Sequence, residues 1–210
     1  MGVKCFFLED TKRLRRQLRC YRSCEGITPC SLMPGEYSRH DASVPFDEIE
    51  DQSSDGTIGP STDKPDASDP RWPTHCECGY AFEESDEHQV FVERLYLRSD
   101  TGEAVTLRDA PPGALYYADW FPDEPYYRGP DGHHLVAKLP NGATWSIDGH
   151  ASNCTDTDGF WRGEHKCWVR HGDPTTGNIT VDKNGATCNA GAGSILSGNY
   201  HGFLQNGEFT

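Results

Sequence analysis

Short apolar segments separated by turn residues make up the second half of the chain. Val, Ile, Leu and aromatic residues recur over four to eight positions and are then interrupted by Gly, Asn, Asp or Pro. The segments are 90–97 paired with 104–107, 135–139 paired with 144–148, and the shorter units 179–181 and 202–209. The Asn141-Gly142 pair between two of them is a strong signal for a hairpin turn. The pattern predicts a mainly β protein, built as an antiparallel sheet or a small open barrel with few short helices.

The first 22 residues join an aromatic segment to a basic one. Residues 3–8 have the length and aromatic content of a strand. In the stretch that follows, Leu14, Leu18 and Tyr21 recur at helical spacing, with Lys and Arg between them. This predicts an amphipathic helix docked on the surface, and a hairpin arm is the alternative interpretation. Either form also offers a basic surface to an anion or a partner.

The composition changes between residues 47 and 69, where Asp, Ser, Gly, Thr and Pro replace nearly all apolar residues. Such a stretch is typical of a linker or mobile loop. We therefore expect three parts, which are an N-terminal strand and basic arm (1–46), an acidic linker or loop (47–69), and a β-rich zinc-binding domain (70–210).

Composition and charge narrow the class of protein. The 210 residues are long enough for an ordinary core, and the aromatic content of 11% is too high for a disordered chain. The formal net charge of −14 argues against nucleic-acid binding over the whole surface, since phosphate contacts need clustered Lys and Arg. Nucleic-acid binding is therefore not expected, with the basic N-terminal arm as the one region that could still meet an anion. The sequence has neither an apolar run of membrane-spanning length nor a signal peptide, so we expect no membrane association and a cytoplasmic location.

The nine cysteines are the clearest chemical signal. Cytoplasmic thiols stay reduced, so cysteines in close pairs favour metal binding over disulfides. Cys76 and Cys78 flank one residue and are followed by Gly79, Tyr80 and Phe82. Zinc ribbons place two thiolates on such a turn, although their usual spacing is one residue longer. Two further ligands are therefore needed from elsewhere in the chain.

Cys154 and Cys167 are the natural second pair, at the two ends of a polar, glycine-containing stretch. The prediction is one structural zinc held by four thiolates, with the site inserted as a zinc knuckle. The alternatives are His165 or His75 in place of one sulfur, unliganded buried cysteines, or a Cys154–Cys167 disulfide. Two weaker candidate sites are Cys20, Cys24 and Cys30 with His40, and Cys188 with His201.

Catalytic use of these residues has less support. A catalytic zinc needs three protein ligands, an open position and a nearby base. Histidines and an acid that could serve are His133, His134, Asp148, His150, His165 and His171. The sequence contains neither the His-Glu-x-x-His pattern of metallopeptidases nor the deaminase signature. Cys154 near His150 or His171 can be drawn as a nucleophile and its base, but nine Cys and nine His make such proximity common.

Four motifs carry a resemblance. They are the segments Cys-x-Cys-Gly-Tyr-x-Phe (76–82), Trp-Ser-Ile-Asp-Gly-His-Ala-Ser-Asn-Cys (145–154), Lys-Cys-Trp-Val-Arg-His-Gly (166–172) and Tyr-His-Gly-Phe-Leu-Gln-Asn-Gly-Glu-Phe-Thr (200–210). In these the chain resembles uncharacterised proteins encoded by tailed bacteriophages and prophages. The resemblance implies a source, the cytoplasm of a bacterial host or the virion, and no activity.

Together these observations predict a phage-encoded accessory module that binds zinc and engages a protein or assembly partner. A metal-dependent hydrolase acting during infection, with His150, His165 or His171 around an open metal position, is the first alternative. A structural component of the virion is the second.

Overall fold

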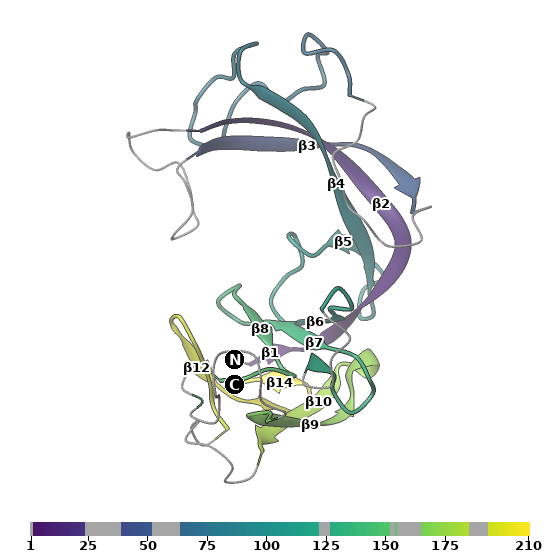
Figure 1. Cartoon of the computed structure of the whole chain (residues 1–210), viewed down its shortest axis with the longest axis vertical. Coiled ribbons are helices and arrows are strands. Elements are labelled where there is room, and N and C mark those ends of the chain that lie inside the picture. The colour runs from purple at the N-terminus through teal and green to yellow at the C-terminus, as the bar shows by residue number, and fades with distance from the viewer. Residues whose placement is uncertain are drawn as a thin grey trace. The chain divides into compact units, whose positions relative to one another are not determined.

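The structure is a computed structural model that describes residues 2–23, 39–51, 64–121, 127–151, 154, 165–184 and 193–210. Within these ranges it is mainly β, with strands throughout and one short 3-10 helix (Figure 1). The predicted fold class is therefore confirmed. The chain forms two compact units, one of Met1–Glu9 with Tyr96–Thr210 (unit 1) and one of Asp10–Leu95 (unit 2). This division differs from the three parts expected from composition.

Unit 2 is built on long antiparallel strands. These are β2 (Phe6–Ser23), β3 (Arg39–Glu50) and β4 (Glu87–Arg98), of which β2 and β4 continue into unit 1 (Figure 1). β3 pairs with β2 with Cys20 opposite Ala42 and Leu14 opposite Ile49, and the register shifts between Arg16 and Gln17. A small core of Leu18, Cys20, Trp72 and Val90 fills the inner face.

The predicted surface helix over residues 11–22 is wrong, because this stretch is strand β2, and the hairpin alternative describes it. A spacing of four residues fits both the helical and the strand period, since residues such as Leu14 and Leu18 lie on one face of either element. Carboxylates on β3 pair with arginines of this stretch and stabilise it as a strand of the hairpin. Arg16 Nε donates to Asp47 Oδ1 over 2.6 Å, and Arg19 Nε donates to Asp41 Oδ1 over 2.8 Å. Arg16 and Arg19 are thus matched by acids within the hairpin.

The expected linker (47–69) is only partly described. Asp47–Glu50 belong to β3, and Arg94 Nη2 donates to Asp51 Oδ2 over 2.6 Å. Residues 52–63 lie outside the described part of the chain. The end of β3 therefore extends into the stretch that composition marks as a linker.

Unit 1 consists of short strands. They are β1 (Val3–Lys4), β5 (Ala104–Thr106), β6 (Ala114–Tyr117), β7 (Leu135–Lys138), β8 (Thr144–Ser146), β9 (Trp168–Asp173), β10 (Asn178–Lys183), β11 (Ile195–Ser197), β12 (Tyr200–Gly202), β13 (Leu204–Gln205) and β14 (Glu208–Phe209), with the helix η2 (Pro174–Thr176) between β9 and β10. The predicted hairpins are present as β4–β5, β7–β8 and β13–β14. Asn206 and Gly207 both have positive φ, as a tight hairpin turn requires.

The sheets are open. The largest has seven strands, with the path β5-β4-β2-β6-β7-β8 and β3 added against β2. β6 runs parallel to β2 at Phe6 and Phe7, whereas the other pairings with an established register are antiparallel. Because the described strands end the path at β5 and β8, this sheet is not closed into a barrel.

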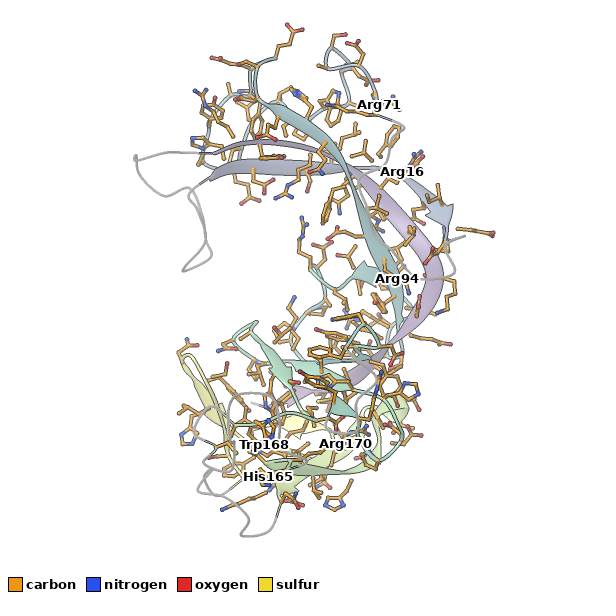
Figure 2. All side chains as sticks on the ribbon, in the orientation of Figure 1. Arg16, Arg71, Arg94, His165, Trp168 and Arg170 are labelled. Atoms are coloured by element: carbon orange, nitrogen blue, oxygen red, sulfur yellow. The ribbon has the colours of Figure 1, made fainter. Side chains whose placement is uncertain are left out.

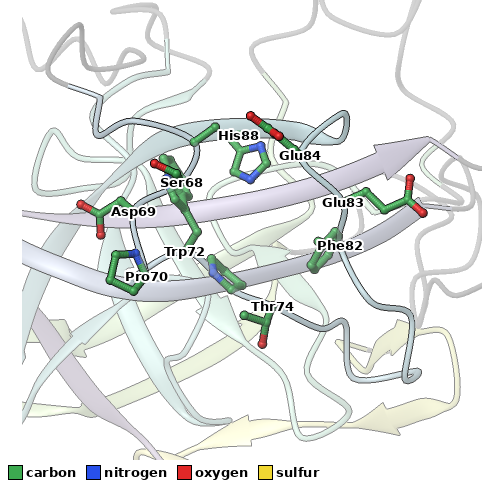
Figure 3. Close-up of a pocket in the computed structure, with 11 residues that line it drawn as sticks. Ser68, Asp69, Pro70, Trp72, Thr74, Phe82, Glu83, Glu84 and His88 are labelled. Carbon is green, nitrogen blue, oxygen red and sulfur yellow. The ribbon is translucent and has the colours of Figure 1, made fainter.

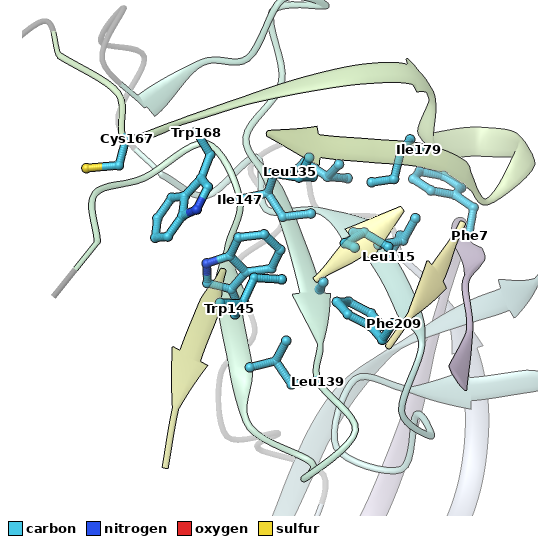
Figure 4. Close-up of a cluster of buried hydrophobic side chains, with 14 residues drawn as sticks. Phe7, Leu115, Leu135, Leu139, Trp145, Ile147, Cys167, Trp168, Ile179 and Phe209 are labelled. Atoms are coloured by element: carbon cyan, nitrogen blue, oxygen red, sulfur yellow. The ribbon is translucent and has the colours of Figure 1, made fainter. Parts of the chain in front are cut away.

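A large hydrophobic core lies inside unit 1. Leu115, Leu135, Ile179 and Phe209 are each at most 1% exposed, and Figure 4 shows their side chains converging from different strands. Burying side chains of this size stabilises the fold by about 1.5–3 kcal/mol each. One edge of this core is formed by Trp145, Trp168 and Cys167, and this edge positions the candidate site described next.

Candidate metal centres

Two groups of Cys and His side chains have the composition and spacing of a metal site. His40, Cys76 and Cys78 form the first, in unit 2, which we call the knuckle group. Cys154, His165 and Cys167 form the second, in unit 1, which we call the core-edge group. Within each group the ligand atoms all lie within 4.8 Å of one another.

The knuckle group is built on a tight turn between Thr74 and Phe82. The Cys76 N–H donates to the Tyr80 carbonyl over 2.8 Å, and the Gly79 N–H donates to the Cys76 carbonyl over 2.9 Å. Gly79 has φ of +89°, a conformation that side chains with a Cβ rarely adopt. The turn holds both sulfurs on one side of the loop, with Cys76 buried and Cys78 exposed.

His40 completes the knuckle group from strand β3. Its Nδ1 lies 3.2 Å from Cys78 Sγ, and its ring stacks on Tyr80 at 4.1 Å with an interplanar angle of 3°. The Tyr80 hydroxyl is held in turn, because it accepts from Arg22 Nη1 over 2.6 Å and donates to Asp86 Oδ2 over 3.1 Å. The imidazole is therefore oriented by its neighbours before any metal arrives.

The core-edge group is anchored to the large core. Cys167 is 2% exposed and precedes Trp168, whose ring meets Trp145 edge to face at 5.3 Å (Figure 4). Asn184, at the end of β10, holds the backbone of this segment, since its N–H donates to the Cys167 carbonyl and its Nδ2 to the Lys166 carbonyl. His165, labelled beside Trp168 in Figure 2, has its Nε2 3.6 Å from Cys167 Sγ. The third member, Cys154, donates its backbone N–H to the Ala151 carbonyl over 3.0 Å.

The spacing in both groups fits a tetrahedral metal. Zn–S bonds of about 2.3 Å and Zn–N bonds of about 2.0 Å place a bound sulfur and nitrogen about 3.6 Å apart. The observed N···S separations are 3.2 Å in the knuckle group and 3.6 Å in the core-edge group. Each group could thus hold a metal ion with little movement of its side chains.

All four predicted metal ligands belong to these groups, Cys76 and Cys78 to one and Cys154 and Cys167 to the other. A single site holding the four sulfurs stays a prediction. Of the two histidines considered as substitutes, His165 joins a group, while His75 Nδ1 contacts Thr74 Oγ1.

The other predictions for the cysteines have mixed outcomes. Cys154 and Cys167 are free thiols, so the disulfide alternative is not what the structure shows. His40 groups with the knuckle cysteines and not with Cys20. Burial raises the pKa of Cys20 to about 11, with the Asp86 carboxylate adding to the effect, which disfavours the thiolate a metal requires. The remaining proposed ligands Cys24, Cys30 and Cys188 lie outside the described residues.

Sequence reasoning missed a buried charge network in unit 1. Arg170, labelled in Figure 2, donates from Nε to Asp148 over 3.1 Å and from Nη1 to Asp131 over 3.0 Å. A Cβ at Gly129 would come within 3 Å of the Arg170 and Asp148 side-chain ends, so a larger residue there would require this network to shift. Burial alone would raise the pKa of Asp131, but hydrogen bonds from Arg170 and Tyr117 outweigh it and lower the pKa to about 2. No spacing in the sequence marks these residues as partners.

His134 is a buried histidine with a structural explanation. Its Nδ1 contacts the Tyr127 carbonyl at 2.6 Å, its Nε2 contacts the Ser146 hydroxyl, and Phe121 stacks on its ring at 4.2 Å. Burial lowers its pKa, which keeps the ring neutral. Both ring nitrogens are thus satisfied, and His134 is not a metal ligand here.

A shallow pocket lies elsewhere in unit 2. It has a volume of about 320 Å³ and is lined by residues that include Trp72, Phe82, Glu83 and His88 (Figure 3). None of the six residues of the two metal groups lines it. The pocket and the metal groups are therefore separate features of the molecule.

Comparison of the chain with protein families, with curated proteins and with solved structures gave no match. Among the described residues, none of the helices has the length and apolar character to cross a membrane.

Proposed function

We propose that this protein is a zinc-stabilised binding module that engages a protein partner, and that each Cys/His group holds its own zinc. The observation that carries the proposal is the presence of one such group in each compact unit. Zinc suits the mixture of thiolate and imidazole ligands and requires no redox chemistry. The motif resemblance described above adds a phage setting, with the module acting in the bacterial host or in the virion.

The placement of the groups supports a structural role for the metal. In the knuckle group an ion would tie strand β3 to the turn at residues 74–82, and in the core-edge group it would tie Cys154 to the start of β9. Metal bound between such segments contributes directly to folding free energy. The alternative of a metal-dependent hydrolase would need a substrate cavity beside one of the groups, and the pocket of Figure 3 does not supply it, because neither group is in its lining.

Exposed apolar side chains support the binding role. Trp120 is 62% exposed, Leu196 on β11 is 68% exposed, and Phe203 is 39% exposed. Large aromatic side chains of this kind are enriched in protein interfaces, where they contribute most of the binding energy.

Metal analysis of the full chain, purified without chelator, tests the proposal. We expect two zinc ions per chain, one for each group. C78S and C167S should each lose one ion, and the double variant should lose both. Cys5 supplies the matched control, because it is in neither group and burial raises its pKa to about 12, so C5S should keep both ions.

The possible results separate three cases. One zinc per chain that either C78S or C167S removes would show a single four-sulfur site and contradict the assignment of two centres. A wild-type chain without metal would overturn the proposed function itself.

A further inference from the structure

One ring nitrogen beside the core-edge group lacks a hydrogen-bond partner among the described residues. His150 Nε2 is fully buried, and within the described part of the chain no donor or acceptor pairs with it. Buried polar atoms are nearly always paired, so an unpaired one calls for a ligand, a water or an ion. His133 and His171 of this unit differ, since His133 contacts Asp119 and His171 faces Asp182.

The ring of His150 lies next to one member of the core-edge group, His165. His150 is four residues before Cys154, whose N–H donates to the carbonyl of Ala151, the neighbour of His150, over 3.0 Å. Its ring is nearly parallel to that of His165, with the ring centres 6.0 Å apart. Two imidazoles bound to one tetrahedral zinc have ring centres roughly 5 Å apart, given Zn–N bonds of about 2.0 Å. The observed separation is close to this value.

We propose that His150 is the fourth ligand of the core-edge group, which then binds zinc through Cys154, His165, Cys167 and His150 Nε2. The inference rests on the proposed function, because it requires that this group holds a metal. His150 lies outside the three-membered group, so its side chain must turn toward the sulfurs when the ion binds. Binding would pair the buried nitrogen and close the tetrahedral shell. A closed shell leaves no position for a catalytic water, which makes this a structural site.

The test uses the full chain carrying C76S and C78S, so that the core-edge group alone binds metal. Zinc affinity is measured by competition with a chromophoric chelator, and cobalt(II) is used as a spectroscopic probe. We expect H150A to weaken zinc binding by more than 100-fold, beyond the roughly 10–100-fold that loss of an outer-shell partner costs. H171A is the matched control, since His171 is exposed on β9 of the same unit, and it should keep the parent affinity.

H150C keeps the test valid if H150A folds poorly. A thiolate at position 150 should retain the metal and add one sulfur ligand, which raises the thiolate-to-cobalt charge-transfer absorption above that of the parent. Parent protein that binds zinc while H150A retains its affinity, or an H150C cobalt spectrum identical to that of the parent, would overturn the assignment of His150 alone. If the C76S/C78S parent and the wild-type chain both bind no metal, the proposed function is overturned as well.

Discussion

The two metal groups are similar in their ligands and different in their construction. The knuckle group takes both sulfurs from one tight turn, with Cys78 at the surface and His40 supplied by a strand. The core-edge group takes its sulfurs from positions 13 residues apart in the sequence, and Cys167 is anchored to the large core. A local turn can present two thiolates by itself, whereas the second arrangement exists only when unit 1 has folded. The stability of unit 1 should therefore control the core-edge zinc far more than the knuckle zinc.

Breaking the buried charge network should give the largest difference in metal retention between the two groups. R170M removes the cation that pairs with Asp148, a residue that is only 4% exposed. Loss of one partner of a buried ion pair lowers the free energy of unfolding by about 3–5 kcal/mol. We expect a loss of this size in urea unfolding, together with loss of the core-edge zinc and retention of the knuckle zinc.

Arg22 provides the control for this experiment. It lies beside Tyr80 and Asp86 in unit 2, but its side chain is 51% exposed. R22M should change the free energy of unfolding little, because exposed ion pairs contribute weakly. Equal losses from R170M and R22M would contradict the difference drawn between the two groups.

A smaller effect should appear on acidification of unit 1. The folded-state pKa of Asp131 is lowered from 3.8 to about 2, so its carboxylate stabilises the fold above about pH 4 and that contribution is lost as the pH falls through 2. The shift corresponds to at most about 2 kcal/mol, and solvent screening reduces it because the side chain is about one-third exposed. The difference in unfolding free energy between wild type and D131N should thus be largest at pH 7 and shrink toward pH 2.

The comparison carboxylate is Asp69 in unit 2. Its pKa is also lowered to about 2, by hydrogen bonds from Arg71, but this partner is two positions away in the sequence and 57% exposed, so the unfolded chain can keep much of the interaction. D69N should therefore show a weaker dependence on pH than D131N. Taking differences from wild type at each pH cancels the release of metal by acid, which is common to both chains.

The smallest effect should come from the knuckle turn. G79A forces a Cβ into a positive-φ conformation, at a cost of about 1 kcal/mol, without steric contact because nothing lies within 4 Å of the added atom. We expect zinc binding at the knuckle group to weaken several-fold while the core-edge group is unchanged, as measured by chelator competition. Gly132 has the same conformation and equal space in unit 1, so G132A should carry the same strain without affecting the knuckle zinc. Weakening by both variants alike would show that the effect is not local.

The sequence predicted those parts of the structure that depend on neighbouring residues. The β7–β8 turn at Asn141-Gly142 and the Cys76–Gly79 turn are specified by a few adjacent side chains, and both are present. The assignment of residues 11–22 as a helix failed because Leu14 and Leu18 satisfy both periods. The pairing of acids on β3 with arginines on β2 favours the strand over the helix, but it can be recognised only once the register is known.

The histidines of the two groups could not be chosen from the sequence for a related reason. His40 approaches Cys78 across 38 positions, and nine histidines were available as partners. Its selection depends on the β2–β3 pairing and on the stacking of Tyr80, which are tertiary features. His165 was considered only as a substitute for a sulfur, yet its closeness to Cys167 made it the easier of the two to find.

The pairing of β1 with β14 has a consequence for the order in which the protein can fold during synthesis. Val3 lies opposite Phe209, and Phe209 is 1% exposed inside the large core. The core of unit 1 therefore cannot close on the ribosome until nearly the whole chain has emerged, and it must then pay the entropy of joining distant segments. Unit 2 is one continuous stretch, Asp10–Leu95, and its contacts are available much earlier. The knuckle group is thus complete in the nascent chain while the core-edge cysteines are still unmade or exposed, so the two zinc ions would be acquired in a fixed sequence, knuckle first.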